Sequence, residues 1–133
     1  MLKEYSLKTD KEGLYDITSK VFEAVKESDI KQGIVVCYNV HTTAGITVNE
    51  NCDDDVKGDI LLGLSKAFPD RLEFKHGEGN SCAHLKASCV GASQTFIIAN
   101  GKILLGTWQG IYFCEFDGPR QRRFYVKVIA DKN

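Results

Sequence analysis

The strongest constraint on the fold is the pair Asn100-Gly101, which lies between two short apolar runs. Thr95–Ile98 precedes this pair and Lys102–Leu105 follows it. Asn-Gly tolerates the positive φ angles of a type I′ turn, so the stretch predicts a β-hairpin. Ile111–Phe116 and Phe124–Ala130 are predicted as further strands. We therefore expect the last third of the chain to be antiparallel sheet.

Two segments have the periodicity of amphipathic helices. Apolar residues recur on one helical stripe of Asp16–Ser28, and Asp16 is suited to accept the first free backbone N–H groups as N-cap. In Val56–Phe68 an apolar residue recurs every four positions. Asp53–Asp55 precede this segment, where negative charge interacts favourably with a helix N-terminus, and Pro69 ends it.

The middle of the chain contains shorter strand-like runs. Ile34–Tyr38 is continuously β-branched or aromatic, as in a strand that is covered on both faces. Gly45–Val48 predicts a second strand, and the alternating Leu and Phe of Arg71–Lys75 predict a third. Ser81–Val90 fits either a helix or a strand, and its Ala and Lys residues favour a short helix.

Length and composition are those of one globular domain. The 133 residues match one ordinary domain of about 100–150 residues. The hydrophobic content of 43% and the charged content of 26% exclude the composition of a disordered chain. We expect residues 1–133 to form a single compact α+β domain, with a mostly antiparallel sheet of about six or seven strands and two or three helices.

Charge and the length of the apolar runs argue against two classes of partner. A formal net charge of −1 gives no long-range field that attracts a polyanion, so we expect no nucleic-acid partner. The apolar runs are shorter than the ~20 residues of a membrane span, and the first residues have no apolar signal segment. These observations indicate a cytoplasmic protein without a membrane partner.

The cysteines indicate a reducing compartment. The chain has five of them, an odd number without a C-x-x-C pair, which argues against a disulfide framework and a thiolate zinc cluster. We expect reduced and mostly buried thiols at these positions: Cys37, Cys52, Cys82, Cys89 and Cys114.

The three histidines are the main candidates for a functional site. His76 and His84 lie on either side of the glycine-rich stretch after His76, and His41 follows the predicted strand Ile34–Tyr38. Three neutral imidazoles with an open position can hold zinc or another divalent ion. Their spacing matches no helical metal motif such as H-E-x-x-H, so a structural or surface role for each histidine stays open.

Other side chains near these positions can support chemistry. Glu50 can act as a general base or support a cation, or it can be a helix-proximal surface charge. Trp108 lies between glycines and next to Gln109, where it can stack on a ligand ring or fill the core. Arg120, with two further arginines at 122 and 123, can bind phosphate or pair with acidic neighbours.

Four motifs together resemble the YjbQ-like family in identity and order, over nearly the whole chain. They are His41–Glu50, His76–Asn80 with Ala83-His84, Gly106–Gly110, and Glu115–Arg120. Many members have Ala-Asp-Pro-Asp before the second helix, where this chain has Cys52–Asp55. Asp53 should still cap that helix.

The resemblance implies a small cytoplasmic α+β protein that assembles as a homotrimer, with thiamine-phosphate synthase-type activity. It also implies that the positions matching the family's pattern are functional: His41, Asn49, Glu50, His76, Asn80, His84, Trp108, Gln109 and Arg120.

The leading hypothesis is a transferase that joins hydroxymethylpyrimidine pyrophosphate to thiazole phosphate and releases pyrophosphate. In this hypothesis the three histidines bind a divalent metal, zinc or magnesium, or contact phosphate oxygens directly. Glu50 and Arg120 are the catalytic candidates, with Arg122 or Arg123 helping Arg120 at the phosphates. The substrate-binding candidates are Asn49, Asn80, Trp108, Gln109 and Arg120.

Two other functions fit the same residues. The first is a zinc-dependent hydrolase of a small phosphorylated or amide substrate, with metal-bound water as nucleophile. The second is a non-catalytic trimeric module that binds a small phosphorylated ligand.

Overall fold

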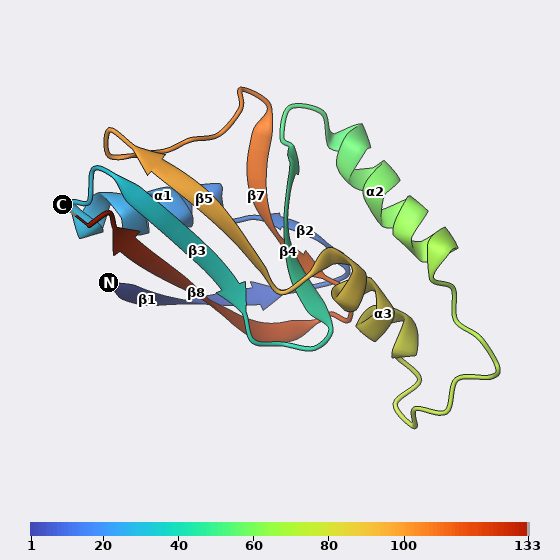
Figure 1. Cartoon of the computed structure of the whole chain (residues 1–133). Helices are drawn as coiled ribbons and strands as arrows, with labels where there is room; N and C mark the ends of the chain where they lie inside the picture. Colours follow the sequence, from blue (N-terminus) through green and yellow to red (C-terminus); the bar gives the residue numbers. More distant parts are fainter. Residues whose placement is uncertain (133) are drawn as a thin grey trace.

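The computed structural model describes residues 1–132, which form eight strands and three helices (Figure 1). The strands are β1 (Leu2–Thr9), β2 (Gly13–Asp16), β3 (Gly33–Asn39), β4 (Ala44–Glu50), β5 (Ser93–Ala99), β6 (Lys102–Ile103), β7 (Gln109–Glu115) and β8 (Arg120–Ala130). The helices are α1 (Thr18–Ser28), α2 (Asp54–Ala67) and α3 (Ser81–Val90).

The strands form two antiparallel sheets. One sheet has five strands in the order β1-β8-β3-β5-β6, and the other has three in the order β2-β7-β4. The predicted single α+β domain with antiparallel strands is confirmed. The expected single sheet of six or seven strands is wrong in its detail, because the N-terminal strands β1 and β2 were not predicted and the strands divide between two sheets.

The core lies between the two sheets and α1. Phe113 of the smaller sheet and Phe124 of the larger one meet with ring centroids 6.1 Å apart, so aromatic packing joins the two layers. Helix α1 adds one buried stripe to the same cluster, as its periodicity predicted. The inner positions of β3, β4, β5 and β7 complete the cluster with Val35, Cys37, Ile46, Phe96, Ile98 and Ile111.

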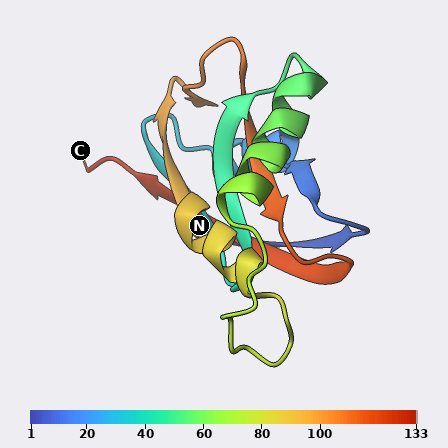
Figure 2. The same cartoon turned by 90° about the vertical axis from the view of Figure 1, so that its right-hand side faces the viewer.

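The other two helices lie at one end of the sheets. Ala83 and Ala87 of α3 pack against Cys114 and Phe116, and Figure 2 shows α2 and α3 on the same side of β4. Helix α2 has no fully buried residue. Buried Lys86 on α3 forms an ion pair of 2.9 Å with Glu12 and donates to Ser65 of α2, so it ties three segments together.

The predicted hairpin and the predicted cap of α2 are confirmed, whereas the predicted N-cap of α1 is wrong, because Ile17 and not Asp16 occupies that position. Asn100 and Gly101 have φ angles of 54° and 78°, and Ile98 pairs with Ile103 across the turn. Asp53 accepts the N–H of Asp55 at 2.9 Å, so α2 keeps a capped start without proline. Helix α1 starts at Thr18 rather than Asp16, but the Asp16 carboxylate accepts the Thr18 N–H at 2.9 Å.

Two strand predictions are wrong. Arg71–Lys75 is turn and irregular chain, because Leu72 is fully exposed and the segment pairs with no described strand. Strand β3 is covered on one face only, and Ile34 and Tyr38 on its other face are 37% and 47% exposed. The prediction for Ser81–Val90 is confirmed, since this segment is helix α3.

The five cysteines are free thiols, as predicted, but only Cys37 and Cys114 are buried. Burial raises the pKa of each of these two thiols to about 12, so both are inert packing groups at neutral pH. Among the described residues, no helix is long and apolar enough to cross a membrane.

Candidate functional site

The three histidines border one cavity within a single chain. Four segments contribute: the β3–β4 connection, the α2–α3 connection, α3 and the start of β8. The cavity has a volume of about 400 Å³, and we call it the histidine pocket. It is lined by Val40, His41, Thr42, Thr43, His76, Glu78, Asn80, His84, Arg120 and Arg122.

His41 is positioned by the buried side chain of Asn39. The Asn39 Oδ1 accepts the His41 N–H at 2.8 Å, and its Nδ2 donates to the Ala44 carbonyl at 2.8 Å. This amide therefore replaces the strand hydrogen bonds that β3 loses where the chain turns toward β4. Asn39 was not among the predicted site residues, although its position at the end of a predicted strand is typical of a turn-forming asparagine.

The His41 ring is held in a neutral form. Its Nε2 accepts the backbone N–H of Arg123 at 3.0 Å, so the neutral ring carries its proton on Nδ1. Burial lowers the pKa of His41 below its ordinary value, and the neighbouring guanidinium groups of Arg122 and Arg123 lower it further.

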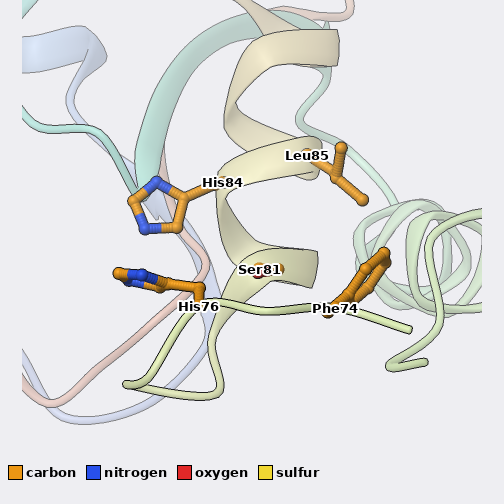
Figure 3. A pocket seen from close by; sticks show the side chains of 5 residues that line it. All are labelled: Phe74, His76, Ser81, His84 and Leu85. Carbon is orange, nitrogen blue, oxygen red and sulfur yellow. The ribbon is translucent and has the colours of Figure 1, made fainter. Parts of the chain in front are cut away.

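His76 and His84 form a pair. Their ring centroids are 5.3 Å apart and the rings are nearly perpendicular, so two imidazoles from the α2–α3 connection and from α3 lie side by side (Figure 3). The His76 Nε2 also lies 3.9 Å from a carboxylate oxygen of Glu78. Glu78 lies within the motif His76–Asn80 but is not among the predicted site residues.

Asn80 supplies a buried acceptor to this region. Its Nδ2 donates to the Asp117 carboxylate at 2.7 Å, which fixes which end of the amide carries oxygen. The Oδ1 is buried and has no hydrogen-bond partner within residues 1–132. Because a buried acceptor without a donor costs about 1–3 kcal/mol, this oxygen favours a ligand that brings an N–H or O–H group.

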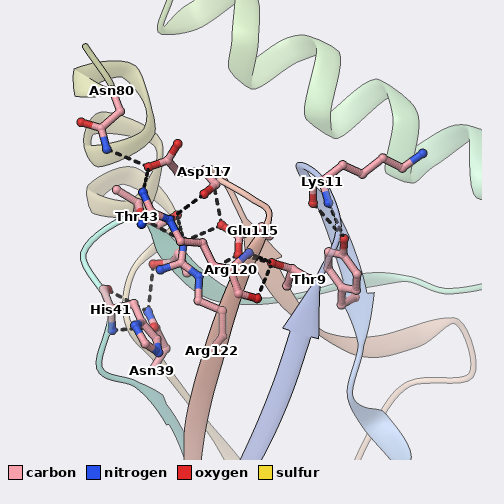
Figure 4. A network of polar contacts seen from close by, with 12 residues as sticks. Thr9, Lys11, Asn39, His41, Thr43, Asn80, Glu115, Asp117, Arg120 and Arg122 are labelled. Atoms are coloured by element: carbon pink, nitrogen blue, oxygen red, sulfur yellow. Dashed lines mark hydrogen bonds and ion pairs between the residues drawn. The ribbon is translucent and has the colours of Figure 1, made fainter. Parts of the chain in front are cut away.

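A buried ion pair, one member of which lines the pocket, is part of a network of polar contacts (Figure 4). Glu115 on β7 is fully buried, and Arg122 on β8 donates to it from Nε at 2.7 Å and from Nη2 to its second oxygen. Arg122 also donates to the Thr43 hydroxyl at 2.8 Å, and Thr9 donates to Glu115 at 2.7 Å. The Glu115–Arg122 pair therefore connects β1, β7 and β8 with the loop that carries His41, which Arg122 reaches through Thr43.

These contacts decide the charge of Glu115. Burial alone would raise the pKa of its carboxyl group, but hydrogen bonds from Arg122, Thr9 and the Asp117 N–H outweigh burial, so the pKa lies below its ordinary value. Arg122 and Arg123 are predicted to help Arg120 bind a phosphate group, and the contacts that they make in the structure reduce this help. Arg122 is committed to Glu115, and Arg123 gives His41 only its backbone N–H.

Arg120 is the guanidinium that remains available to a ligand. It forms an ion pair of 2.8 Å with Asp117 through Nη2 and donates from Nε to the Asp117 carbonyl at 3.0 Å. Nη1 has no hydrogen-bond partner in the described part of the chain. Burial would raise the pKa of Asp117, but Asn80 and Arg120 hold it below its ordinary value, so Arg120 is oriented by a carboxylate anion.

A three-histidine metal centre is one of the predictions for this pocket. Within residues 1–132, no three His, Cys, Asp or Glu side chains are arranged to hold a metal ion. His41 already uses Nε2 for the Arg123 N–H, and two guanidinium groups line the same cavity. The arrangement therefore suits an anion better than a cation held by all three imidazoles.

The remaining predicted residues lie at the opposite end of β4 and β7. Ala44 pairs with Glu115 near the histidine pocket, whereas Glu50 pairs with Gln109 at the other end. Six residues of extended strand span about 20 Å. Asn49, Glu50, Trp108 and Gln109, which we call the tryptophan end, are therefore not part of the histidine pocket of the same chain.

Trp108 is 61% exposed, so the alternative of a core tryptophan is wrong. The Gln109 Oε1 accepts the Gly106 N–H at 2.8 Å and shapes the loop that carries Trp108. A Cβ on Gly110 would lie 2.8 Å from the Cβ of Asn51, so glycine is required for the close approach of these two segments. The motif around Trp108 therefore forms a loop of defined conformation, and the Trp108 side chain on it is exposed.

The fold and the pocket define a small α+β protein with two antiparallel sheets and a histidine- and arginine-lined cavity. The family model described as UPF0047 protein YjbQ-like matches residues 3–131. The chain belongs to this family, as its four motifs predicted.

Relatives match along nearly their whole length. The UPF0047 protein MJ1081 of Methanocaldococcus jannaschii is 59% identical over 133 residues, covering 99% of this chain and 96% of that protein. YugU of Bacillus subtilis is 51% identical over 132 residues, covering 98% and 100%. A crystal structure of an uncharacterized conserved protein of the family from Clostridium acetobutylicum has 58% identity and a TM-score of 0.93, covering 96% of this chain and 99% of that one.

Removing one partner of the buried ion pair should destabilise the protein strongly. We expect Glu115→Gln to lower the free energy of unfolding by about 3–5 kcal/mol, because it leaves the Arg122 guanidinium buried without its counter-ion. Urea unfolding followed by circular dichroism measures this change. The matched control is Glu4→Gln, at an exposed position of β1. A loss below about 1 kcal/mol would show that the pair does not anchor the sheets.

His41 should titrate below pH 6.5 in the folded protein. Its folded-state pKa is lower than its unfolded-state value of about 6.5, so its contribution to stability is present above that pH and is lost as the pH falls through the folded-state pKa. NMR of the imidazole C–H resonances between pH 4 and 8, assigned with His41→Gln, gives the value. Titration of His41 at or above 6.5 would contradict the neutral, buried ring.

Proposed function

We propose that the histidine pocket binds the phosphate group of a small phosphorylated molecule. One observation carries this proposal: His41, His76, Asn80, His84 and Arg120 come from four segments of the chain and line one cavity. Imidazole N–H groups and a guanidinium are the donors that protein sites use for phosphate oxygens. The Asn80 Oδ1 accepts from a hydroxyl of the ligand or from a protonated phosphate oxygen.

Each side chain has a separate part in binding. Arg120 offers Nη1 while Asp117 holds its other nitrogens in place. His76 and His84 donate N–H groups from one side of the cavity, and His41 donates from Nδ1 on the other. A bound dianion stabilises the charged form of an imidazole, so phosphate binding raises the pKa of His41 toward its ordinary value.

The reaction we propose for this pocket is the transferase reaction that the resemblance implied. Joining hydroxymethylpyrimidine pyrophosphate to thiazole phosphate releases pyrophosphate, and oriented N–H donors stabilise the charge that develops on this leaving group. Incubation of the purified protein with both precursors, with and without magnesium, should yield thiamine phosphate. Phosphate binding without any product would exclude the reaction and leave the non-catalytic binding module.

A divalent metal, zinc or magnesium, stays a prediction. The observation that favours it is the close pair His76–His84 with Glu78 at 3.9 Å from His76. A zinc ion on this pair would support the alternative of a zinc-dependent hydrolase. Elemental analysis of protein purified without chelators and a test for a magnesium requirement decide between the hydrolase and the transferase. One zinc per chain favours the hydrolase, and a requirement for added magnesium favours the transferase.

We further propose a homotrimer in the cytoplasm. The five free cysteines fit a reducing compartment. The outer face of the larger sheet is apolar at its centre, where Ile34 pairs with both Ile97 and Ile129 and all three are exposed. A contiguous exposed apolar patch is typical of a subunit interface.

Replacing the available guanidinium should weaken phosphate binding. We expect Arg120→Gln to raise the dissociation constant for inorganic phosphate and for pyrophosphate by about tenfold or more, because a hydrogen bond to a charged group is worth about 1.5–3 kcal/mol. Isothermal titration calorimetry measures both ligands. Arg123→Gln is the matched control, since its side chain does not line the cavity. Equal affinities of the two variants and the parent would refute the assignment.

The apolar sheet face should control assembly. Light scattering on the parent should give three times the 14.8 kDa of one chain. The double variant Ile34→Lys, Ile129→Lys should give monomers, because two buried lysines at an interface are strongly unfavourable. Leu62→Lys, on the exposed side of α2, should stay trimeric. An assembly unaffected by the double variant would place the interface elsewhere.

A further inference from the structure

A separate cavity lies at the end of the five-stranded sheet that is remote from the histidine pocket. It has a volume of about 560 Å³ and lies between α1, the α1–β3 connection and the β5–β6 turn. Gly33, which starts β3, pairs with Ile98 close to this turn, whereas Asn39 at the other end of β3 holds His41. About 20 Å of extended strand therefore separates the two cavities. Figure 1 shows α1 and the end of β5 on the side of the molecule away from α3.

Three lysines from three segments border this cavity, which we call the lysine cavity. Lys26 comes from α1, Lys31 from the α1–β3 connection and Lys102 from β6. Glu23 is the one acidic side chain that lines it, so three positive charges and one negative charge leave a net charge of +2, on a chain whose formal net charge is −1. Within residues 1–132, Lys31 pairs with Asp29 at 3.1 Å, and the other two lysines form no ion pair. The lysine cavity therefore carries positive charge that the described residues do not neutralise.

The β5–β6 turn holds Lys31 in place. The Gly101 N–H donates to the Lys31 carbonyl at 2.9 Å, so the α1–β3 connection is bound to the turn. A Cβ on Gly101 would lie 3.2 Å from the Cδ of Lys31, so the stem of this lysine crosses the turn where any other side chain would push against it. Gln32 donates from its amide to the Asn100 Oδ1 at 3.3 Å. The Asn100 Nδ2, which has no hydrogen-bond partner within residues 1–132, is therefore a further donor at the lysine cavity.

Phe22 gives the lysine cavity an apolar wall. It is 36% exposed, lies outside the buried stripe of α1 and does not pack against the main core cluster. The other exposed positions of α1 are all polar or charged: Ser19, Glu23, Lys26 and Glu27. The lysine stems add hydrocarbon surface, because lysine can lay its methylene groups on an apolar surface while its ammonium group stays in water. The lysine cavity thus combines an aromatic surface with ammonium groups around it.

We propose that the lysine cavity binds a small organic anion that has an apolar body and at least one acidic group. Its volume is within the range of about 300–1,000 Å³ that is usual for small-molecule sites. Phe22 packs against the apolar body, and the three ammonium groups and the Asn100 amide donate to the acidic group. This site shares no residue with the histidine pocket, so it goes beyond the proposed phosphate binding and does not depend on it.

Two fluorescent dyes of the same shape test this assignment: anilinonaphthalene sulfonate and its uncharged analogue N-phenylnaphthylamine. The double variant Lys26→Gln, Lys102→Gln should raise the dissociation constant of the sulfonate dye about fivefold, because it removes two exposed ionic contacts, and should leave the neutral dye unchanged. Phe22→Ser should weaken the binding of both dyes, because it removes the apolar wall. The matched control is Lys11→Gln, Lys66→Gln, which changes the net charge equally at two exposed positions outside the cavity and should bind both dyes like the parent.

Three results would overturn the proposal. If the Lys26 and Lys102 double variant binds the sulfonate dye as tightly as the parent, no acidic group lies in the lysine cavity. If Arg120→Gln weakens the sulfonate dye and the double variant does not, the dye occupies the histidine pocket. If Phe22→Ser keeps the parent's affinity for both dyes, the cavity holds no apolar body. Circular dichroism shows whether each variant is folded, and should Phe22→Ser unfold, the lysine double variant decides alone.

Discussion

The buried pair of Glu115 and Arg122 is the interaction on which the rest of the site depends. A carboxylate without solvent contact has to be paired and hydrogen-bonded, and here one guanidinium, one hydroxyl and one backbone N–H satisfy it. Glu115 is on the three-stranded sheet and Arg122 on the five-stranded one, so the pair aligns the two layers. Through Thr43 the same pair holds the loop that presents His41, and through the Asp117 N–H it holds the turn before Arg120.

This arrangement is the physical basis for the proposed binding of an anion in the pocket. One arginine is used to neutralise a buried carboxylate, a second is oriented by Asp117 with a free nitrogen, and His41 is kept neutral by burial and by neighbouring cations. The result is a cavity lined by a partly unpaired guanidinium and by imidazoles that can donate N–H groups. The imidazoles of His76 and His84 border both the histidine pocket and a second cavity, which Phe74, Ser81 and Leu85 also line.

Local signals predicted local structure well. Asn100-Gly101 formed the hairpin and Asp53 capped α2, since both depend only on backbone geometry within a few residues. Leu72 and Phe74 failed as a strand because alternation alone does not supply a partner strand. The apolar run of β3 showed that both of its faces are hydrophobic, but the second face is uncovered in one chain. The sequence pattern gives the polarity of each side chain, whereas the tertiary packing decides which other residues that side chain contacts.

The sequence by itself determined the α+β class, the family, the free thiols and the three histidines as a set. It did so because periodicity, turn residues and ordered motifs are properties of neighbouring positions. Only the tertiary structure decided that Arg122 is buried against Glu115 whereas Arg120 is half-exposed and paired with Asp117. It also decided that Glu50 and Trp108 lie at the far end of β4 and β7 from His41. Those distinctions depend on strand register and on which charges are buried together, and both are set by contacts between residues that are remote in the chain.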